Sequence, residues 1–427
     1  MSSAACTHAH GHIGQRVCRH LFGGPADSYA HRFTGVGLEY DLVCGDCAAL
    51  EEPPAGDLVA VCGDCFEGVV GRASWLRGER AVLSQPAVLE RATQLYFSHH
   101  MIHMPVALGA SLLDLQPASG SGSRWLAVTS AGALVGLDLD ARTWTRRADL
   151  GAAIDVELEL ALTLSPDGRL AAVVEERGQS GVVIDTSTGD ITMLLERGPD
   201  QVEGARFPVA FAERGGRTLL VQGTAWNRLD AFDPRTGELL TERPAGGGAG
   251  HAMAYVCSGL SVSPDGEWLV ENGFTSETAG MPAAFRLGRW LEENRWEAED
   301  GPSRRYLCQR SDYWDGPLCW IDARTLALWG YGPDRASLLP AVLLFDVDSG
   351  EPLRWFPGPR GELVFDDHLF SLGDGEGVSV WDIDSGERLL HDAGFHPLRY
   401  HRGARQFLTT NPDGELFVLS QLVGDAG

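Results

Sequence analysis

The chain has 427 residues, enough for two or three domains that bury a core without disulfides, which excludes a small disulfide-dependent fold. Its 59 acidic and 34 basic residues give a net charge of −25, which would repel a phosphate backbone or an anionic lipid surface. We therefore expect neither nucleic acid nor a membrane as a partner. The 53 glycines and 22 prolines indicate many turns and favour an all-β fold.

The first residues, MSSAACTHAHGH, show no basic segment followed by an apolar one, and the chain contains no run of about 18 apolar residues. We therefore expect a cytoplasmic protein, in which thiols stay reduced and clustered cysteines indicate a metal more than disulfides. Every basic residue is arginine. The lack of lysine disfavours a Walker-type phosphate loop and a Schiff base, and suggests a GC-rich bacterial genome.

A five-residue segment, VCGDC, occurs twice in the first 70 residues, at 43–47 and 61–65. Each copy holds two cysteines at C-x2-C spacing, which presents two thiolates to one ion at about 2.3 Å. Cys44 and Cys47 are followed after fourteen residues by Cys62 and Cys65, a spacing typical of zinc sites.

Two C-x-H pairs precede these segments, so more ligands are present than one tetrahedral site can use. The candidate metal ligands are Cys6, His8, Cys18, His20, Cys44, Cys47, Cys62 and Cys65. They would suit one or two structural zinc ions, because closed, thiolate-rich sites are of the structural kind. The spacing leaves open which C-x-H pair shares an ion with which C-x2-C pair.

The order C-x-H, C-x2-C, C-x2-C resembles the ubiquitin-hydrolase type of zinc finger, with VCRHL and CGDCFEGVVGR as the matching segments. The resemblance covers about fifty residues and implies a small zinc-binding domain over 1–70. The later histidine ligands of that family are missing, so ubiquitin binding is not inferred. The segment is poor in apolar residues, and we expect the metal to serve as its core.

Two other interpretations of the cysteines stay open. They could be buried, reduced thiols that pack as small hydrophobic groups, with the histidines forming a polar tail. They could also be redox-active, because C-x2-C pairs can be catalytic, although the βαβ pattern of a redox fold is absent. A zinc- or redox-responsive sensor is a related alternative.

Residues 71–107 are predicted to form a connector with one short helix, since apolar residues recur there at mixed helical spacing around Pro86. His99, His100 and His103 lie in this connector. No carboxylate accompanies them at a useful spacing, so a loop is the simpler interpretation than a second metal group.

From residue 108 the sequence changes to short apolar runs separated by turns. SPDG or NPDG begins at 165, 263 and 411, and D-x2-[ST]-G begins at 185, 233, 346 and 382. Asp caps such turns and Gly supplies a positive φ. Units of roughly 40 to 50 residues with four strands indicate a β-propeller.

These turns resemble those of the WD-repeat and YVTN-type propeller families, with VSVWDIDSGERLL as the closest match. The resemblance implies a propeller over 108–422 with a tail at 423–427, and it says little about function. We predict seven blades, with six as the alternative. The last blade lacks a strand, and we expect a segment before the first blade, such as MPVALG at 104–109, to complete it.

Aromatic residues and arginines crowd into the fourth and fifth predicted blades. Trp290, Arg305, Tyr313 and Trp314 are the candidate partner-binding residues. The alternative is that these rings pack between blades. With no nucleophile elbow, HExxH helix or phosphate loop in the sequence, we expect an intracellular scaffold that binds another protein. The alternative is a propeller enzyme, quinoprotein-like or hydrolytic, with a site on the central channel.

Overall fold

The computed structural model describes two units, a small N-terminal module and a ring of β-sheets. The described residues are 12–24, 26, 28–33, 40–50, 55–70, 74–75, 88–200, 203–244, 251, 254–275, 279–311, 315–331, 338–373, 375–411 and 414–425. Among these residues, no helix is both long and apolar enough to span a membrane.

The N-terminal module is built on a five-stranded sheet with the order β4-β1-β3-β2-β5. Its strands are β1 (His12–Cys18), β2 (Ser28–Phe33), β3 (Tyr40–Cys44), β4 (Leu58–Cys62) and β5 (Ser74–Trp75). Its helices are α1 (Arg19–Phe22), α2 (Gly45–Ala48) and α3 (Gly63–Val70), with a 3-10 turn at Ala55–Asp57. Strand β1 runs parallel to β3 and antiparallel to β4.

The module has an apolar core of its own. Its buried residues are Val17, Cys18, Leu21, Tyr29, Leu42, Val43, Cys44, Cys47, Val61, Phe66 and Val69. The expectation that this segment is too poor in apolar groups to form a core is therefore wrong. Valines on the central strands pack against leucine and phenylalanine from α1 and α3, and three cysteines complete this cluster.

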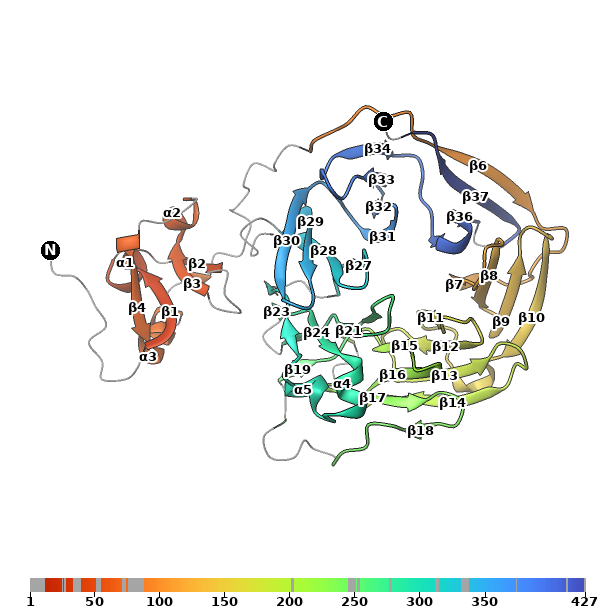
Figure 1. The fold of residues 1–427 in the computed structure, drawn as a ribbon, viewed down its shortest axis with the longest axis horizontal. Coiled ribbons are helices and arrows are strands. Elements are labelled where there is room, and N and C mark those ends of the chain that lie inside the picture. Colours follow the sequence, from red (N-terminus) through yellow and green to blue (C-terminus); the bar gives the residue numbers. More distant parts are fainter. Residues whose placement is uncertain are drawn as a thin grey trace.

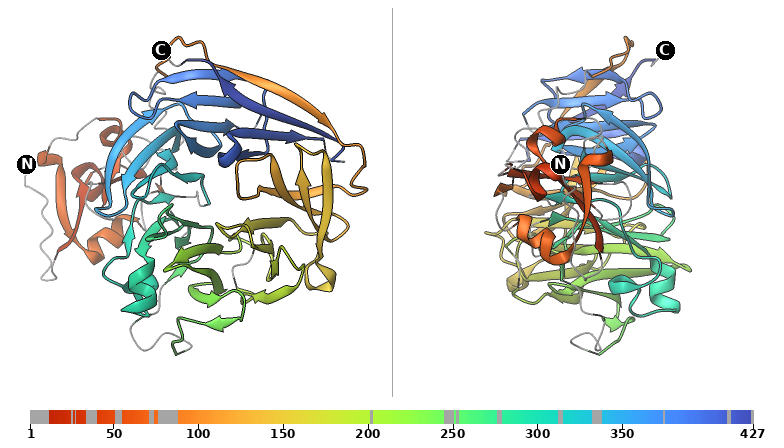
Figure 2. Two further views of the ribbon diagram at one scale, coloured as in Figure 1. Left: turned by 45° about the vertical axis from the view of Figure 1, so that its right-hand side comes forward. Right: turned by 90° about the vertical axis from the view of Figure 1, so that its left-hand side faces the viewer.

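The second unit is a propeller of seven four-stranded antiparallel blades, as predicted (Figure 1). Blade one has β7 (Leu112–Pro117), β8 (Arg124–Thr129), β9 (Ala133–Asp138) and β10 (Thr143–Asp149); blade two has β11 (Leu160–Leu164), β12 (Leu170–Glu175), β13 (Ser180–Asp185) and β14 (Ile191–Glu196). Blade three has β15 (Val209–Arg214), β16 (Arg217–Ala225), β17 (Arg228–Asp233) and β18 (Glu238–Leu239). The turned views in Figure 2 show the blades stacked side by side around the ring.

The remaining blades follow the same order along the chain. Blade four has β20 (Leu260–Val262), β21 (Trp268–Glu271), β24 (Ala283–Arg286) and β25 (Arg305–Tyr306); blade five has β27 (Leu318–Trp320), β28 (Thr325–Tyr331), β29 (Leu338–Asp346) and β30 (Glu351–Pro357). Blade six has β31 (Glu362–Asp366), β32 (His368–Gly373), β33 (Gly377–Trp381) and β34 (Arg388–Asp392); blade seven has β35 (Arg399–His401), β36 (Gln406–Thr410) and β37 (Leu416–Val423). Arg305 lies on β25 and therefore belongs to blade four.

Blade four is longer than the others because each of its strands continues past a break. The continuation is a second four-stranded sheet of β19 (Tyr255–Val256), β22 (Phe274–Thr275), β23 (Ala279–Gly280) and β26 (Arg310–Ser311). Gly273 is required at one break, since a Cβ there would lie 2.3 Å from the Val256 carbonyl oxygen. Helices α4 (Leu287–Glu292) and α5 (Glu297–Asp300) lie between β24 and β25.

Strand β6 (Tyr96–His103) closes the ring by pairing antiparallel with β37 along its whole length. The prediction that a segment before blade one completes the last blade is confirmed, but MPVALG is not that segment. The closing strand is the segment directly before it, and it includes the three histidines of the predicted connector. The described part of 71–107 contains β5 and β6 and no helix.

A second segment before the ring, the strap (residues 88–95), lies along the outer strand of blade six. Its backbone exchanges hydrogen bonds with Arg388, and the Gln94 amide donates to the Asp425 carbonyl at 3.2 Å. The Arg91 guanidinium pairs with Asp382 at 2.5 Å and with Glu387 at 2.7 Å. The strap and β6 together join the two ends of the propeller.

The four D-x2-[ST]-G turns share one geometry. In each, the glycine amide donates to the aspartate carbonyl four residues earlier, and the glycine φ is positive. The aspartate carboxylate accepts an amide two residues ahead. Each carboxylate also pairs with an arginine, as in Asp185 with Arg235 of the neighbouring blade at 3.0 Å. The Asp185 turn therefore links two blades, and the Asp382 turn links blade six to the strap through Arg91.

The ring boundary gives a direct test by truncation. A chain beginning at Val88 keeps the strap and β6, and should fold with a cooperative thermal transition. A chain beginning at Met104 lacks β6 and leaves the β37 backbone unpaired over eight residues. It should aggregate or melt at a clearly lower temperature. Equal melting temperatures for the two chains would contradict the closure by β6.

The turn aspartates predict a stability change in acid. Hydrogen bonds from Ser187 and Arg235 lower the pKa of Asp185 to about 2. For Asp233, Asp346 and Asp382, burial alone would raise the pKa, but turn amides and arginines together lower it. A lowered folded-state pKa favours the ionised form. This stabilisation is therefore complete above pH of about 4 and is lost as the pH falls toward about 2.

The Asp185→Asn variant should show this dependence. At pH 7 it should lose stability on the order of 1 kcal/mol, because the amide replaces a charged acceptor. The difference from the native chain should shrink as the pH falls toward about 2, where Asp185 is half protonated, and should disappear below that pH. Urea unfolding midpoints at several pH values measure this. Asp384→Asn, at an exposed position of the blade-six turn, is the control and should have little effect.

Candidate metal centre

Three strand-to-helix corners of the N-terminal module carry its cysteines. Strand β1 ends at Cys18 and α1 follows directly, β3 ends at Cys44 before α2, and β4 ends at Cys62 before α3. In both VCGDC segments the glycine begins the helix and the second cysteine lies in its first turn. This corner turns both thiols of a C-x2-C pair to one side, as a metal ligand pair requires.

The first two corners meet. Cys18, His20, Cys44 and Cys47 place their ligand atoms within 4.8 Å of one another. His20 Nδ1 lies 3.2 Å from Cys47 Sγ and 3.6 Å from Cys44 Sγ, and the Cys44 amide donates to Cys18 Sγ at 3.2 Å. The structure therefore pairs the second C-x-H with the first C-x2-C, which the sequence left open.

This pairing follows from the direction of the strands. Because β1 and β3 are parallel, with Val17 beside Leu42, their carboxyl ends lie at the same edge of the sheet. Their corners, and hence Cys18 and Cys44, come together there. The second ligand of each pair follows in the helix that starts at the corner.

Burial disfavours the thiolate forms of these cysteines unless a cation is bound. Cys18, Cys44 and Cys47 are at most 4% exposed, and His20 covers them from the surface. Burial raises the pKa of the Cys18 thiol, and it raises the pKa of Cys47 to about 12, with the neighbouring thiols adding to the effect. A divalent cation would offset this, because it stabilises thiolates that burial disfavours.

The donor set fits zinc. Three sulfur atoms and one imidazole nitrogen are the ligands that structural zinc sites use, and four ligands complete a tetrahedral shell. No fifth group is required, so a bound ion would have no position for a reacting water. Zinc here would hold β1, β3, α1 and α2 together and would take no part in chemistry.

Cys62 and Cys65 do not join this cluster. Strand β4 is antiparallel to β1, and Cys62 pairs in register with His12 at the start of β1. Since Cys18 pairs with Leu58, the third corner lies at the other end of β4, four residues or about 13 Å away, which is too far for both corners to reach one ion. The two VCGDC segments cannot share an ion across that distance. The other candidates for a second ion, Cys6 and His8, lie outside the described residues.

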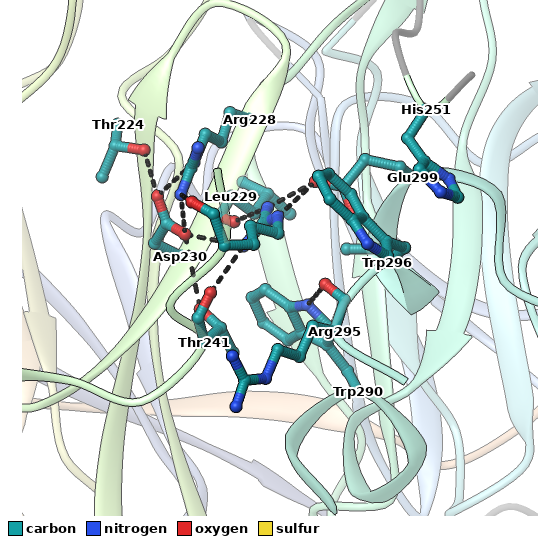
Figure 3. A network of polar contacts seen from close by, with 12 residues as sticks. Thr224, Arg228, Leu229, Asp230, Thr241, His251, Trp290, Arg295, Trp296 and Glu299 are labelled. Atoms are coloured by element: carbon teal, nitrogen blue, oxygen red, sulfur yellow. Dashed lines mark hydrogen bonds and ion pairs between the residues drawn. The ribbon is translucent and has the colours of Figure 1, made fainter. Parts of the chain in front are cut away.

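Some of the aromatic and arginine residues of blade four and of its junction with blade three belong to the core. Trp290 is fully buried, so it cannot contact a partner and its prediction as a partner-binding residue is wrong. Arg243, with a side chain 1% exposed, lies between the rings of Trp290 and Trp296. Its guanidinium pairs with Asp230 at 2.7 Å and with Glu299. Figure 3 labels these two acids and the two tryptophans. The packing alternative is confirmed at this position.

Arg304 is buried in the same way. Its guanidinium pairs with Glu271 at 3.0 Å and lies 4.9 Å from the ring centre of Tyr255 and 5.3 Å from that of Tyr306. A paired guanidinium between aromatic faces can stay charged in a protein interior. No sequence motif distinguishes Arg304 from its neighbours, so only the structure identifies it as a core residue.

Arg305 is the predicted partner-binding residue that the structure leaves on the surface. It lies on the outer strand β25, half-buried, and donates to the Ser349 carbonyl of blade five at 3.1 Å. Tyr313 and Trp314 lie outside the described residues. The predicted surface is therefore reduced to Arg305 and its surroundings.

A polar cluster that the sequence did not reveal joins blades two, three and four. Arg206 pairs with Glu176 at 3.2 Å, and Arg177 lies 3.8 Å from Asp315. Burial raises the pKa of both Glu176 and Asp315. Asp315 has an unusual positive φ of 55° and accepts a hydrogen bond from Ser258. These carboxyls come from loops between strands, where no spacing rule connects them.

Comparisons with known proteins add little. No family model matches the chain, and no curated protein matches it in sequence. Among solved structures, a chain titled "Crystal Structure of Mitotic Checkpoint Complex" aligns with a TM-score of 0.49 and 13% identity, over 79% of this chain and 93% of that chain. Similarity at this level carries no argument about function, so the propeller assignment rests on the sheets described above.

The metal centre predicts the effect of single cysteine substitutions. Cys44→Ser should remove one zinc ion per chain and make the N-terminal module sensitive to protease, because bound zinc contributes folding free energy. The propeller should stay intact, since its core is separate from that of the module. Elemental analysis and limited proteolysis measure both effects.

Cys319→Ser, in blade five, is the matched control and should leave the zinc content unchanged. Native protein that contains no zinc, and whose first 70 residues resist protease, would contradict the assignment. A third outcome is also decisive: unfolding of the whole chain on chelation would show that the two units fold as one.

Proposed function

We propose that this protein is a cytoplasmic scaffold that binds another protein on its propeller and carries an N-terminal module held by structural zinc. The observation that carries the proposal is the convergence of Cys18, His20, Cys44 and Cys47 on one point in the module. A closed ligand set of this kind stabilises a small fold and leaves no position for catalysis. The module is thus best explained as a rigid attachment to a binding domain.

The ion pairs of the propeller support the same proposal, because the charged groups in them stabilise the fold. The buried Arg243 pairs with Asp230 of blade three and with Glu299 of blade four and so links the two blades, and Arg304 pairs with Glu271 inside blade four. The turn aspartates are likewise occupied by backbone amides and arginines. These acids serve folding, which leaves a wide, ordered surface as the functional element.

The net charge of −25 favours partners that are neither nucleic acid nor anionic membrane. A protein partner with a basic surface would be attracted at long range. For the enzyme alternative, candidate groups in the loop cluster are Glu176 and Asp315, whose pKa values burial raises. Both of them already face an arginine.

Arg305 provides the test of the scaffold. Arg305 lies on β25, the outer strand of blade four, and its side chain covers the buried ring of Trp268. It also contacts the turn that precedes β30 of blade five, through the Ser349 carbonyl. If this surface binds a partner, Arg305→Ala should weaken recovery of that partner in affinity purification by about tenfold or more. The melting temperature should change little.

Arg146→Ala is the matched control, since Arg146 is exposed on the outer strand of blade one. It should leave partner recovery unchanged. Equal recovery with native protein and with Arg305→Ala would remove this surface from the proposal. Failure of Arg305→Ala to fold would show that the residue belongs to the core.

A further inference from the structure

A cavity of about 380 Å³ lies between blades five and six, beside the strap. Pro340, Pro357 and Gly358 of blade five form one wall, and Val88 of the strap contributes to another. Its volume lies at the low end of the range for small-molecule sites. This cavity is separate from the metal centre and from the Arg305 surface.

The sequence of blade six creates the cavity. On the face that meets blade five, three cross-strand rows succeed one another along β32 and β33: Leu369 with Trp381, Ser371 with Ser379, and Gly373 with Gly377. Side-chain size falls at each step. The first row packs into the core between the blades, and the other two rows line the cavity.

The blade-six side of the cavity wall carries polar groups, whereas a packing defect would be lined by apolar groups alone. Ser379 is 8% exposed, and its hydroxyl lies 2.9 Å from Nδ1 of His391 on the next strand. Ser371 is 3% exposed and accepts a hydrogen bond from Trp381 Nε1 at 2.9 Å. Since an indole nitrogen only donates, Ser371 can still donate its own hydroxyl hydrogen into the cavity.

Two arginines stand at the rim. Arg360 pairs with Glu376 at 2.9 Å, and both side chains are largely exposed, at 43% and 51%. Arg388 pairs with Glu90 of the strap, whose side chain is 61% exposed. The exposed pair of Arg360 contributes little to stability, so Arg360 can turn to a ligand at small cost. Arg388 is only 26% exposed and lies 5.9 Å from the ring centre of Trp381, so its charge is already held at the rim. Glu376 is the single carboxylate among the residues that line the cavity.

We propose that this cavity binds a small organic anion through a carboxylate or phosphate group. Arg360 and Arg388 supply positive charge at the rim, and the hydroxyls of Ser371 and Ser379 supply donors at the base. Arginine recognises planar and tetrahedral oxyanions through paired N–H donors. Gly373 and Gly377 leave room for the anion to approach the sheet.

Because the cavity lies beside the strap, a bound anion should stabilise the contact between the strap and the ring. Val88 of the strap lines the cavity. Gly358 of blade five packs closely against Val88, since a Cβ at Gly358 would be 3.0 Å from Val88 Cγ2. An anion held by Arg388 would thus contact the blade and the strap at once. Binding should raise the melting temperature, because a ligand that binds the folded state stabilises it.

Isothermal titration calorimetry of the full chain tests the proposal, in a buffer free of phosphate and carboxylate. Inorganic phosphate and succinate are titrated separately. At least one should bind with a dissociation constant of about 1 mM or tighter. Binding of phosphate alone would identify a phosphate-bearing ligand, and binding of succinate alone a carboxylate. Binding of neither anion overturns the proposal.

Variants locate the site. Ser379→Leu should abolish binding by filling the cavity, and Arg360→Gln should weaken it by about tenfold or more. Arg289→Gln is the control, since Arg289 forms an equally exposed pair with Glu293 in blade four. Arg360→Gln removes only an exposed pair, so it decides the question if Ser379→Leu fails to fold. Unchanged affinity in Arg360→Gln overturns the proposal.

Discussion

The hydrogen-bonded ladder between β6 and β37 is the interaction on which the rest of the propeller depends. A ring of sheets is stable only if its first and last members pack, and here residues at opposite ends of the propeller share blade seven. The apolar cluster that joins blades one and seven includes Ile102 of β6 together with Phe417 and Leu419 of β37. Closure therefore supplies the last interface between blades as well as the last strand.

Arginine chemistry explains how an acidic chain without lysine builds this interior. A guanidinium stays charged when buried and offers donors in a planar fork, so one side chain can satisfy two carboxylates and stack between aromatic rings. Arg243 does both, with Asp230 and Glu299 on one side and two indole rings beside it. A lysine at this position would give a single point charge and no stacking surface. The excess of acid is thus partly neutralised within the fold.

The propeller could be predicted because its signals are local. Each D-x2-[ST]-G turn is specified by its own aspartate and glycine, and the repetition of such turns indicates blades without knowledge of their neighbours. The closing strand could not be assigned, since YFSHHMIH carries no turn signal and pairs with residues more than three hundred positions away. The extension of blade four was missed for a related reason. Its strands are two residues long, which is too short for an alternation of apolar and polar residues to be recognised in the sequence.

The candidate metal ligands of the module show what residue spacing can predict and what depends on strand direction. Spacing selected Cys18, His20, Cys44 and Cys47, and the structure brings these four side chains together, because C-x-H and C-x2-C fix the geometry of each pair. Spacing could not say which pairs meet, and it made the two VCGDC segments look like halves of one site. Strand direction decides this: β1 runs parallel to β3 and antiparallel to β4, so identical corners point to opposite ends of the sheet. A repeated ligand segment therefore indicates a repeated corner, and only the register of the strands shows whether its copies share an ion.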